Sequence, residues 1–209
     1  MELVDPEVTR RKLDREIEHW QENEDAYRRR GWVMLGRDGN LIDIAFIADL
    51  PLGGRTIPIL AASVRIDYSN YDLWPPSVAF IDPRSGEFTP PIKDATISTP
   101  EGPRNLIVGG HPDTGRPFFC VVGTREYHFH AQHSGDDWLL HRAEGAGALA
   151  AICNRIWISM VRNLFGLQVV LTTLPPESGE GGRIQIQLAS ADLDAMRAGQ
   201  PIEMHVAGQ

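Results

Sequence analysis

One segment of the sequence, residues 111–142, holds most of the side chains that could do chemistry. Five of the seven histidines and one of the two cysteines lie within these 32 residues. The cysteine is Cys120, and the histidines that follow it most closely are His128, His130 and His133. Random placement rarely concentrates reactive residue types in this way, so we expect this segment to form the functional site.

The first chemistry that this set supports is nucleophilic catalysis by Cys120. The thiolate is the reactive form of cysteine, and a nearby imidazole lowers the pKa of the thiol from about 8.5 toward neutrality. Each of the three histidines named above is a candidate for that imidazole. The carboxylates available to orient the imidazole or an incoming amine are those of Glu126, Asp136 and Asp137.

The second chemistry is metal binding by the same residues. A thiolate and several imidazoles are the ligands that zinc favours. His128 and His130 are two positions apart, so on an extended strand they would point the same way. Glu126 is a further candidate ligand, or would orient a ligand by hydrogen bonding. The alternative ligand set is therefore Cys120, Glu126, His128 and His130, with His133 as an additional imidazole, although the short paired-cysteine spacing of structural zinc sites is absent.

The other cysteine, Cys153, belongs to a different environment. It lies between Ile152 and Ile156 on the apolar face of a helix that the periodicity predicts over residues 146–165. A small thiol at such a position is expected to fill space in the core. Cys120 is therefore the only cysteine for which we predict chemistry.

The elements that must position the site predict an α+β fold. A helix with one apolar stripe is expected from Val4 to Arg30, followed by four antiparallel strands that form a meander. A long irregular segment then carries the reactive residues and leads into the helix of residues 146–165. The expected elements are the helix 4–30, strands 32–35, 41–48, 57–66 and 77–81, the loop 82–115, extended pieces at 118–122 and 126–130, the helix 146–165, strands 167–174 and 183–188, and a short helix 190–197.

Composition and charge limit the possible partners. The sequence has 209 residues, with 28 acidic against 20 basic residues and a formal net charge of −8. Nucleic-acid binding requires clustered positive charge, so we expect no nucleic-acid partner. No apolar run approaches the roughly 18 residues that span a bilayer, and two cysteines form no secreted disulfide framework. We therefore expect a cytoplasmic protein that does not contact a membrane.

Two motifs resemble those of ubiquitin-conjugating enzymes. Residues 71–80, YDLWPPSVAF, are similar to the tyrosine and double-proline segment that leaves the meander in that family. His111-Pro112-Asp113, with Cys120 seven residues later, resembles the His-Pro-Asn motif and the catalytic cysteine. The resemblance covers residues 4–166 as architecture, and residues 167–209 are then an extension packed on the same domain.

This resemblance implies an activity and two partners. Cys120 would receive the carboxyl terminus of a ubiquitin-like protein from an activating enzyme as a thioester and pass it to an amine. The activating enzyme would dock on the amino-terminal helix, which ends in the arginine run 28–30. A histidine or aspartate near Cys120 would steer or deprotonate the acceptor amine. No cofactor is expected for this activity.

Asp113 departs from the family pattern. It stands where the family has an asparagine that stabilises the developing oxyanion, and an ionised carboxylate would oppose that role. A donor elsewhere, from His128, His130 or His133, would have to substitute. Asp113 is nevertheless retained as a candidate catalytic residue, together with Cys120 and Glu126.

A second resemblance concerns the cluster itself. Cys120, Glu126 and two of the three nearby histidines are similar to the Cys-Glu-His-His signature of a bacterial family described as predicted metal-binding, found in operons of ubiquitin-like conjugation systems. The principal expectation is a conjugating enzyme. The alternatives are a zinc-binding domain of the same pathway and an interaction scaffold without active chemistry.

Overall fold

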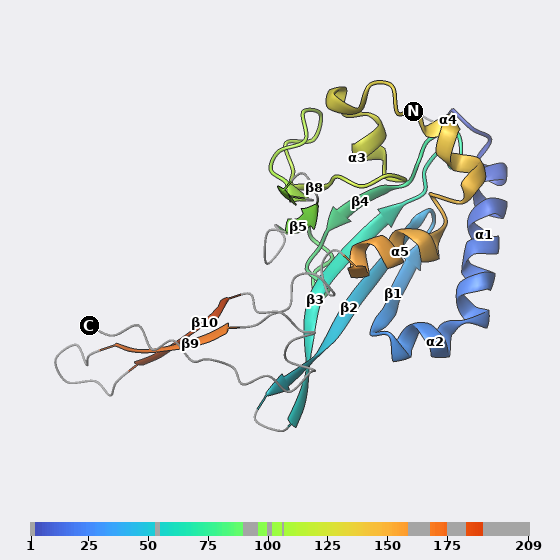
Figure 1. Cartoon of the computed structure of the whole chain (residues 1–209). Helices are drawn as coiled ribbons and strands as arrows, with labels where there is room; N and C mark the ends of the chain where they lie inside the picture. The colour runs from blue at the N-terminus through green and yellow to red at the C-terminus, as the bar shows by residue number, and fades with distance from the viewer. Residues whose placement is uncertain are drawn as a thin grey trace.

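Two consecutive helices and a four-stranded antiparallel sheet form the first half of the chain (Figure 1). The structure is a computed structural model, and it describes residues 3–52, 55–89, 96–99, 102–105, 107–158, 168–174 and 183–189. The order of elements confirms the α+β fold class, with an amino-terminal helix, a four-stranded meander and helices near the end.

The predicted helix 4–30 is two helices, α1 (Pro6–Glu22) and α2 (Glu24–Arg29). Asp5 caps α1 by accepting a hydrogen bond from the Glu7 amide at 2.8 Å. Asn23 interrupts the helical backbone with φ −112° and ψ 10°, which turns α2 away from the axis of α1. The predicted apolar stripe is buried at Leu13, Trp20 and Tyr27, and its fourth member, Ile17, is partly buried against the same core.

The four strands pair in sequence order, which confirms the meander. They are β1 (Trp32–Asp38), β2 (Leu41–Leu52), β3 (Arg55–Asp67) and β4 (Ser77–Phe80). β1, β2 and β3 are each longer than the strands predicted at 32–35, 41–48 and 57–66. Alternate residues of β2 and β3 are fully buried and carry the core of the sheet: Ile42, Ile44, Phe46, Val64 and Ile66.

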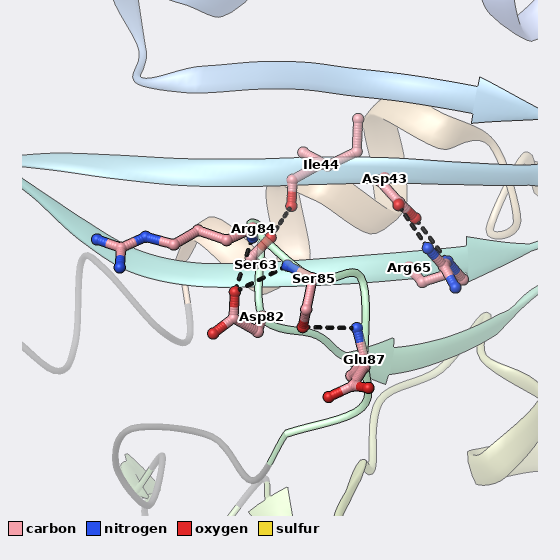
Figure 2. Close-up of polar contacts among 8 residues, drawn as sticks. All are labelled: Asp43, Ile44, Ser63, Arg65, Asp82, Arg84, Ser85 and Glu87. Atoms are coloured by element: carbon pink, nitrogen blue, oxygen red, sulfur yellow. Dashed lines mark hydrogen bonds and ion pairs between the residues drawn. The ribbon is translucent and has the colours of Figure 1, made fainter.

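The turn that follows β4 is closed by its own polar groups (Figure 2). The Asp82 carboxylate accepts hydrogen bonds from the amides of Arg84 at 2.7 Å and Ser85 at 3.3 Å. These bonds lower the pKa of the exposed Asp82 carboxyl. Beside the turn, the Arg65 guanidinium donates two bonds to Asp43 across β2 and β3, at 2.8 and 2.7 Å. The chain is thus redirected at the edge of the sheet before it enters the reactive segment.

The predicted loop 82–115 contains short strands. β5 (Thr96–Thr99) pairs with β6 (Gly102–Asn105), and β7 (Ile107–Val108) pairs with β8 (Phe118–Phe119). β8 confirms the first part of the extended piece expected at 118–122. The β7 and β8 pair leads the chain directly to Cys120.

The extended piece predicted at 126–130 is wrong, because residues 125–128 form the helix α3 (Arg125–His128). Thr124 caps this helix by accepting a hydrogen bond from the Tyr127 amide at 3.4 Å. His128 ends the helix and His130 follows it, so the two rings do not share one face of a strand. Two 3₁₀ turns and a second short helix follow: η1 (Ala131–His133), α4 (Trp138–His141) and η2 (Arg142–Glu144).

The helix predicted at 146–165 is described from Leu149 to Trp157 as α5, which lies across one face of the sheet (Figure 1). Cys153 is fully buried on it, among Leu149, Ile152 and Ile156, which confirms its place in the core. Burial raises the pKa of the Cys153 thiol far above its usual range. This thiol is therefore unreactive in the folded protein.

The predicted carboxyl-terminal strands are confirmed as β9 (Gln168–Leu174) and β10 (Arg183–Ala189), which pair antiparallel. The end of the helix predicted to reach 165, the predicted boundary between residues 166 and 167, and the predicted helix 190–197 lie outside the described residues. Among the described helices, none has the length and apolar character needed to cross a membrane.

Candidate functional site

Cys120 lies at the exit of β8, in a tight turn of the backbone. The Val121 amide donates to the Phe119 carbonyl at 3.0 Å, so Cys120 is the central residue of a three-residue turn. The Thr124 hydroxyl also bonds the carbonyls of Phe119 and Val121, at 3.1 and 2.9 Å. Cys120 itself is 8% exposed. The thiol is therefore held in a fixed, mostly desolvated position.

The imidazole that reaches Cys120 is that of His133. The Cys120 Sγ atom lies 3.2 Å from His133 Nε2, which is within hydrogen-bond distance for sulfur. The 3₁₀ turn η1 brings the ring there, because the His133 amide donates to the His130 carbonyl at 2.9 Å. A thiol and an imidazole in contact can exchange a proton and form a thiolate–imidazolium pair. Of the three histidines that the sequence left open, the structure thus places one against the sulfur.

His128 uses both ring nitrogens in structural hydrogen bonds. The Gly123 amide donates to His128 Nε2 at 3.0 Å, so the ring proton is on Nδ1, which lies 2.8 Å from the Asp136 carbonyl and donates to it. Burial lowers the pKa of His128, and the neighbouring charge of His141 acts in the same direction. The neutral ring therefore connects the turn after Cys120 to the segment after His133.

The lowered pKa of His128 makes a prediction for acid stability. The pKa of His128 in the folded protein lies below its unfolded value of about 6.5. Its contribution to the free energy of unfolding is therefore complete above that pH, and it is lost as the pH falls toward the folded pKa. We expect urea unfolding to show that this group's contribution to the free energy of unfolding decreases as the pH falls from 7.5 to 5.5. The pKa of Asp136 is also lowered, but its contribution is lost only below about pH 4, outside this range.

The control for this prediction is His128→Gln, which has no ionisable ring. The difference in unfolding free energy between the variant and the wild type should shrink as the pH falls from 7.5 to 5.5. A difference that stays constant over this range would show that His128 is not buried in its neutral form.

Glu126 connects α3 to the sheet rather than to Cys120. One of its carboxylate oxygens accepts a hydrogen bond from the Ser77 hydroxyl, and the other accepts from the Val78 amide at 3.1 Å. The side chain is buried, and desolvation raises the pKa of Glu126 against the opposing effect of these two bonds. Arg125 assists from the same helix by donating to the carbonyls of Pro75 and Ser69. Together they fix α3 beside β4.

Two substitutions of Glu126 should separate its geometry from its charge. Glutamine keeps one acceptor for the Val78 amide, and its amide can donate to Ser77 once that hydroxyl turns, so we expect Glu126→Gln to cost less than about 1 kcal/mol. Alanine leaves both donors without an acceptor, and we expect Glu126→Ala to cost about 2 kcal/mol. Urea unfolding at pH 7 checks both values. Equal costs for the two variants would contradict the assigned hydrogen bonds.

His130 and His111 pack against Phe118 of β8, and Asp113 lies on the turn next to His111. The His130 ring stacks on Phe118 with centroids 5.5 Å apart, and its Nδ1 accepts from the Gln132 amide at 3.3 Å. His111 is buried against the edge of Phe118, and its Nδ1 accepts from the Asp113 amide at 3.2 Å. The Asp113 carboxylate lies 4.0 Å from that nitrogen, and 76% of its side chain is exposed. Asp113 is therefore presented to solvent on the turn that His111 anchors.

The candidate metal ligands do not converge in the described part of the chain. No group of three or more histidine, cysteine, aspartate or glutamate side chains there is arranged to hold a metal ion. The donor atoms of Glu126 and His128 are engaged by the backbone and by Ser77. Of the predicted ligands, Cys120 and His133 lie in contact, with Sγ 3.2 Å from Nε2.

Two residues near the site were missed by the sequence analysis. The Tyr127 ring stacks on His133, with centroids 3.9 Å apart and an interplanar angle of 21°. Gly123, at φ +96°, lets the turn after Cys120 approach the Ala146 carbonyl. The position of Tyr127 could have been inferred from Thr124, because a capping residue before Arg-Glu-Tyr-His predicts a short helix rather than a strand. No local pattern indicates the role of Gly123, because that role depends on contact with a distant segment.

The sequence matches a protein-family model and a curated relative. The model of the Y4jH-like family, described as the Y4jH family, matches residues 4–114 and 104–164. The relative is an uncharacterized protein y4jH from Sinorhizobium fredii (strain NBRC 101917 / NGR234). It is 35% identical over 179 residues, which cover 75% of this chain and 83% of the relative. The family match includes the helices, the sheet, Cys120 and His133.

Proposed function

The chain belongs to the Y4jH-like family, and we propose that it is a ubiquitin-conjugating-like enzyme that carries a ubiquitin-like protein as a thioester on Cys120. The observation that carries the proposal is the 3.2 Å contact between Cys120 Sγ and His133 Nε2, in a turn that follows a buried strand. This contact supports the proposal, because acyl transfer requires an activated thiol and an imidazole beside the sulfur can activate it.

The order of elements supports this proposal as a matter of resemblance. A helix, a four-stranded meander, the double proline at 75–76, the motif at 111–113, the cysteine and a helix across the sheet occur in the same order as in ubiquitin-conjugating enzymes. The buried His111 anchors the turn that carries Asp113, and β8 then leads to Cys120. The sequence motifs and the chemistry of the cysteine thus favour the same class of enzyme.

In the proposed first step, the Cys120 thiolate attacks the thioester carbonyl that the activating enzyme presents. A bond forms between Sγ and the acyl carbon, and the bond from that carbon to the sulfur of the activating enzyme breaks. The departing sulfur takes the proton that the His133 imidazolium holds, so His133 becomes neutral. Transfer between two thioesters needs no further reactant.

In the proposed second step, an acceptor amine attacks the acyl carbon on Cys120. The new carbon–nitrogen bond forms, the bond to Sγ breaks, and neutral His133 takes the proton that the amine loses. The thiolate–imidazolium pair is then restored. Asp113, whose carboxylate is exposed on the turn that His111 anchors, is proposed to attract the acceptor in its protonated form. The acceptor then releases one proton to solvent, and the neutral amine attacks the acyl carbon.

The activating enzyme is proposed to dock on the amino-terminal helices. Arg28, Arg29 and Arg30 are all exposed at the end of α2. Arg28 pairs with Glu24 at 2.8 Å, and the Arg30 guanidinium lies 4.9 Å from the centre of the Trp32 ring. Arg29 and Arg30 offer positive charge to an acidic partner at the place where α2 leads into β1.

Zinc binding is the alternative function, and it makes different demands on the same residues. Glu126 and His128 would have to give up their present hydrogen bonds to become ligands. We therefore favour the thioester function. Stoichiometric zinc in the purified protein, lost in a variant with His128 and His130 both changed to alanine, would support the alternative.

The proposal is tested by incubating the protein with its ubiquitin-like protein, the activating enzyme and ATP. We expect an adduct that reducing agent cleaves, formed by the wild type and by Cys153→Ala but not by Cys120→Ala. Cys153→Ala is the matched control because it removes the other thiol and keeps a small apolar side chain in the core. Absence of an adduct in the wild type, or its survival in Cys120→Ala, would overturn the proposal.

A further inference from the structure

The hydrogen-bond network behind His133 suggests how its ring is held. The Tyr127 ring covers the face of the His133 ring at 3.9 Å, nearly parallel to it. The Tyr127 hydroxyl donates to Asp136 Oδ2 at 2.7 Å. The Tyr127 ring that packs on His133 is thus itself fixed by a hydrogen bond to Asp136.

Asp136 is the fixed point to which Tyr127 is tied. Its other carboxylate oxygen bonds to His141 Nε2, and its amide donates to the His133 carbonyl at 3.0 Å. Its own carbonyl accepts from His128 Nδ1. The bonds from His141 and Tyr127 lower the pKa of Asp136, so the carboxyl is ionised at neutral pH. An ionised carboxylate makes a stronger acceptor for the Tyr127 hydroxyl.

We propose that Tyr127 and Asp136 are positioning residues for the Cys120–His133 pair, and that the stacked Tyr127 ring favours the protonated form of His133. This inference rests on the proposed function of Cys120. The face of an aromatic ring attracts a cation, so the tyrosine stabilises imidazolium more than neutral imidazole. A more stable imidazolium in turn stabilises the Cys120 thiolate.

The effect of the Tyr127 ring on His133 can be separated from the effect of the hydrogen bond between the Tyr127 hydroxyl and Asp136. Tyr127→Phe keeps the ring and removes the hydroxyl, whereas Tyr127→Leu removes the ring as well. Asp136→Ala keeps the tyrosine and releases its hydroxyl. We therefore expect the largest effect in the leucine variant and smaller effects of the same sign in the other two.

The experiment measures the pH dependence of alkylation of Cys120 by iodoacetamide, with the modified peptide quantified by mass spectrometry. We expect Tyr127→Leu to lower the alkylation rate at pH 7 about threefold and to move the midpoint of the profile to higher pH. Tyr127→Phe and Asp136→Ala should each lower it by less than about twofold. Phe129→Leu is the matched control. It removes an exposed aromatic ring at the end of the same helix, and that ring packs against Trp74 rather than against His133.

The outcomes separate this inference from the proposed function. A profile for Tyr127→Leu that coincides with the wild type would overturn the positioning role, even where the thioester forms. A wild-type midpoint near that of an ordinary thiol would instead contradict the activated Cys120 on which the proposed function rests. If Tyr127→Leu does not fold, unchanged profiles for both Tyr127→Phe and Asp136→Ala would overturn the tie to Asp136.

Discussion

Replacing His133 with alanine is expected to raise the midpoint of the alkylation profile of Cys120 by about two pH units. The reason is the contact between Sγ and Nε2 at 3.2 Å, which allows an imidazolium to stabilise the thiolate. At pH 7 the fraction of thiolate, and with it the rate of alkylation, should fall on the order of tenfold. Mass spectrometry of the Cys120 peptide at several pH values gives the profile. Cys153 provides an internal reference, because it is fully buried and should stay unmodified in the folded protein.

The comparison that makes this prediction sharp is His130→Ala. His130 carries the same ring, precedes His133 by three residues and stacks on Phe118, with its ring centroid 5.9 Å from that of His133. We expect its replacement to shift the midpoint by less than roughly half a unit, because only a charge close to the sulfur has a large effect. A shift in His130→Ala as large as that in His133→Ala would mean that the assigned pair is wrong. The thioester assay should rank the two variants in the same order.

The sequence indicated the sheet more accurately than the site. The run of strand composition at residues 41–48 predicted β2, and the structure buries Ile42, Ile44 and Phe46 on one face of that strand. The single helix predicted over 4–30 was interrupted because Asn23 adopts a non-helical backbone, which apolar periodicity does not reveal. Periodic patterns thus located the elements but not their breaks.

The choice among three histidines could not be made from the sequence. His128 and His130 resembled a strand pair, but Thr124 caps a helix that separates their directions. His133 reaches Cys120 because η1 follows His130 and because Asp136 bonds its carbonyl. Asp136 is itself held by Tyr127 and His141, so the position of His133 depends on residues up to eight positions away. Local propensity carries no information about such a network.

The fixed position of Cys120 also depends on a glycine, Gly123, and changing this glycine should strongly destabilise the protein. Gly123 has φ +96°, a conformation in which other residues are strained. A Cβ atom there would lie 2.3 Å from the Ala146 carbonyl oxygen and 2.6 Å from Arg155 Nη1. The Arg155 side chain could move, but the Ala146 carbonyl belongs to the backbone that leads into α5. The turn after Cys120 would therefore have to separate from that segment.

We expect Gly123→Ala to destabilise the protein by at least about 3 kcal/mol, from backbone strain together with the steric clash. Gly145→Ala is the matched control, since Gly145 also has a positive φ, +73°, but a Cβ atom there meets nothing within 4 Å. The control should cost only about 1–2 kcal/mol. Urea unfolding measures both, and equal costs would show that the approach of Gly123 to Ala146 is not required. If Gly123→Ala still folds, its amide should no longer donate to His128, and the segment that carries His133 should loosen. The rate of Cys120 alkylation at pH 7 should then fall, even at a lower temperature at which the variant is fully folded.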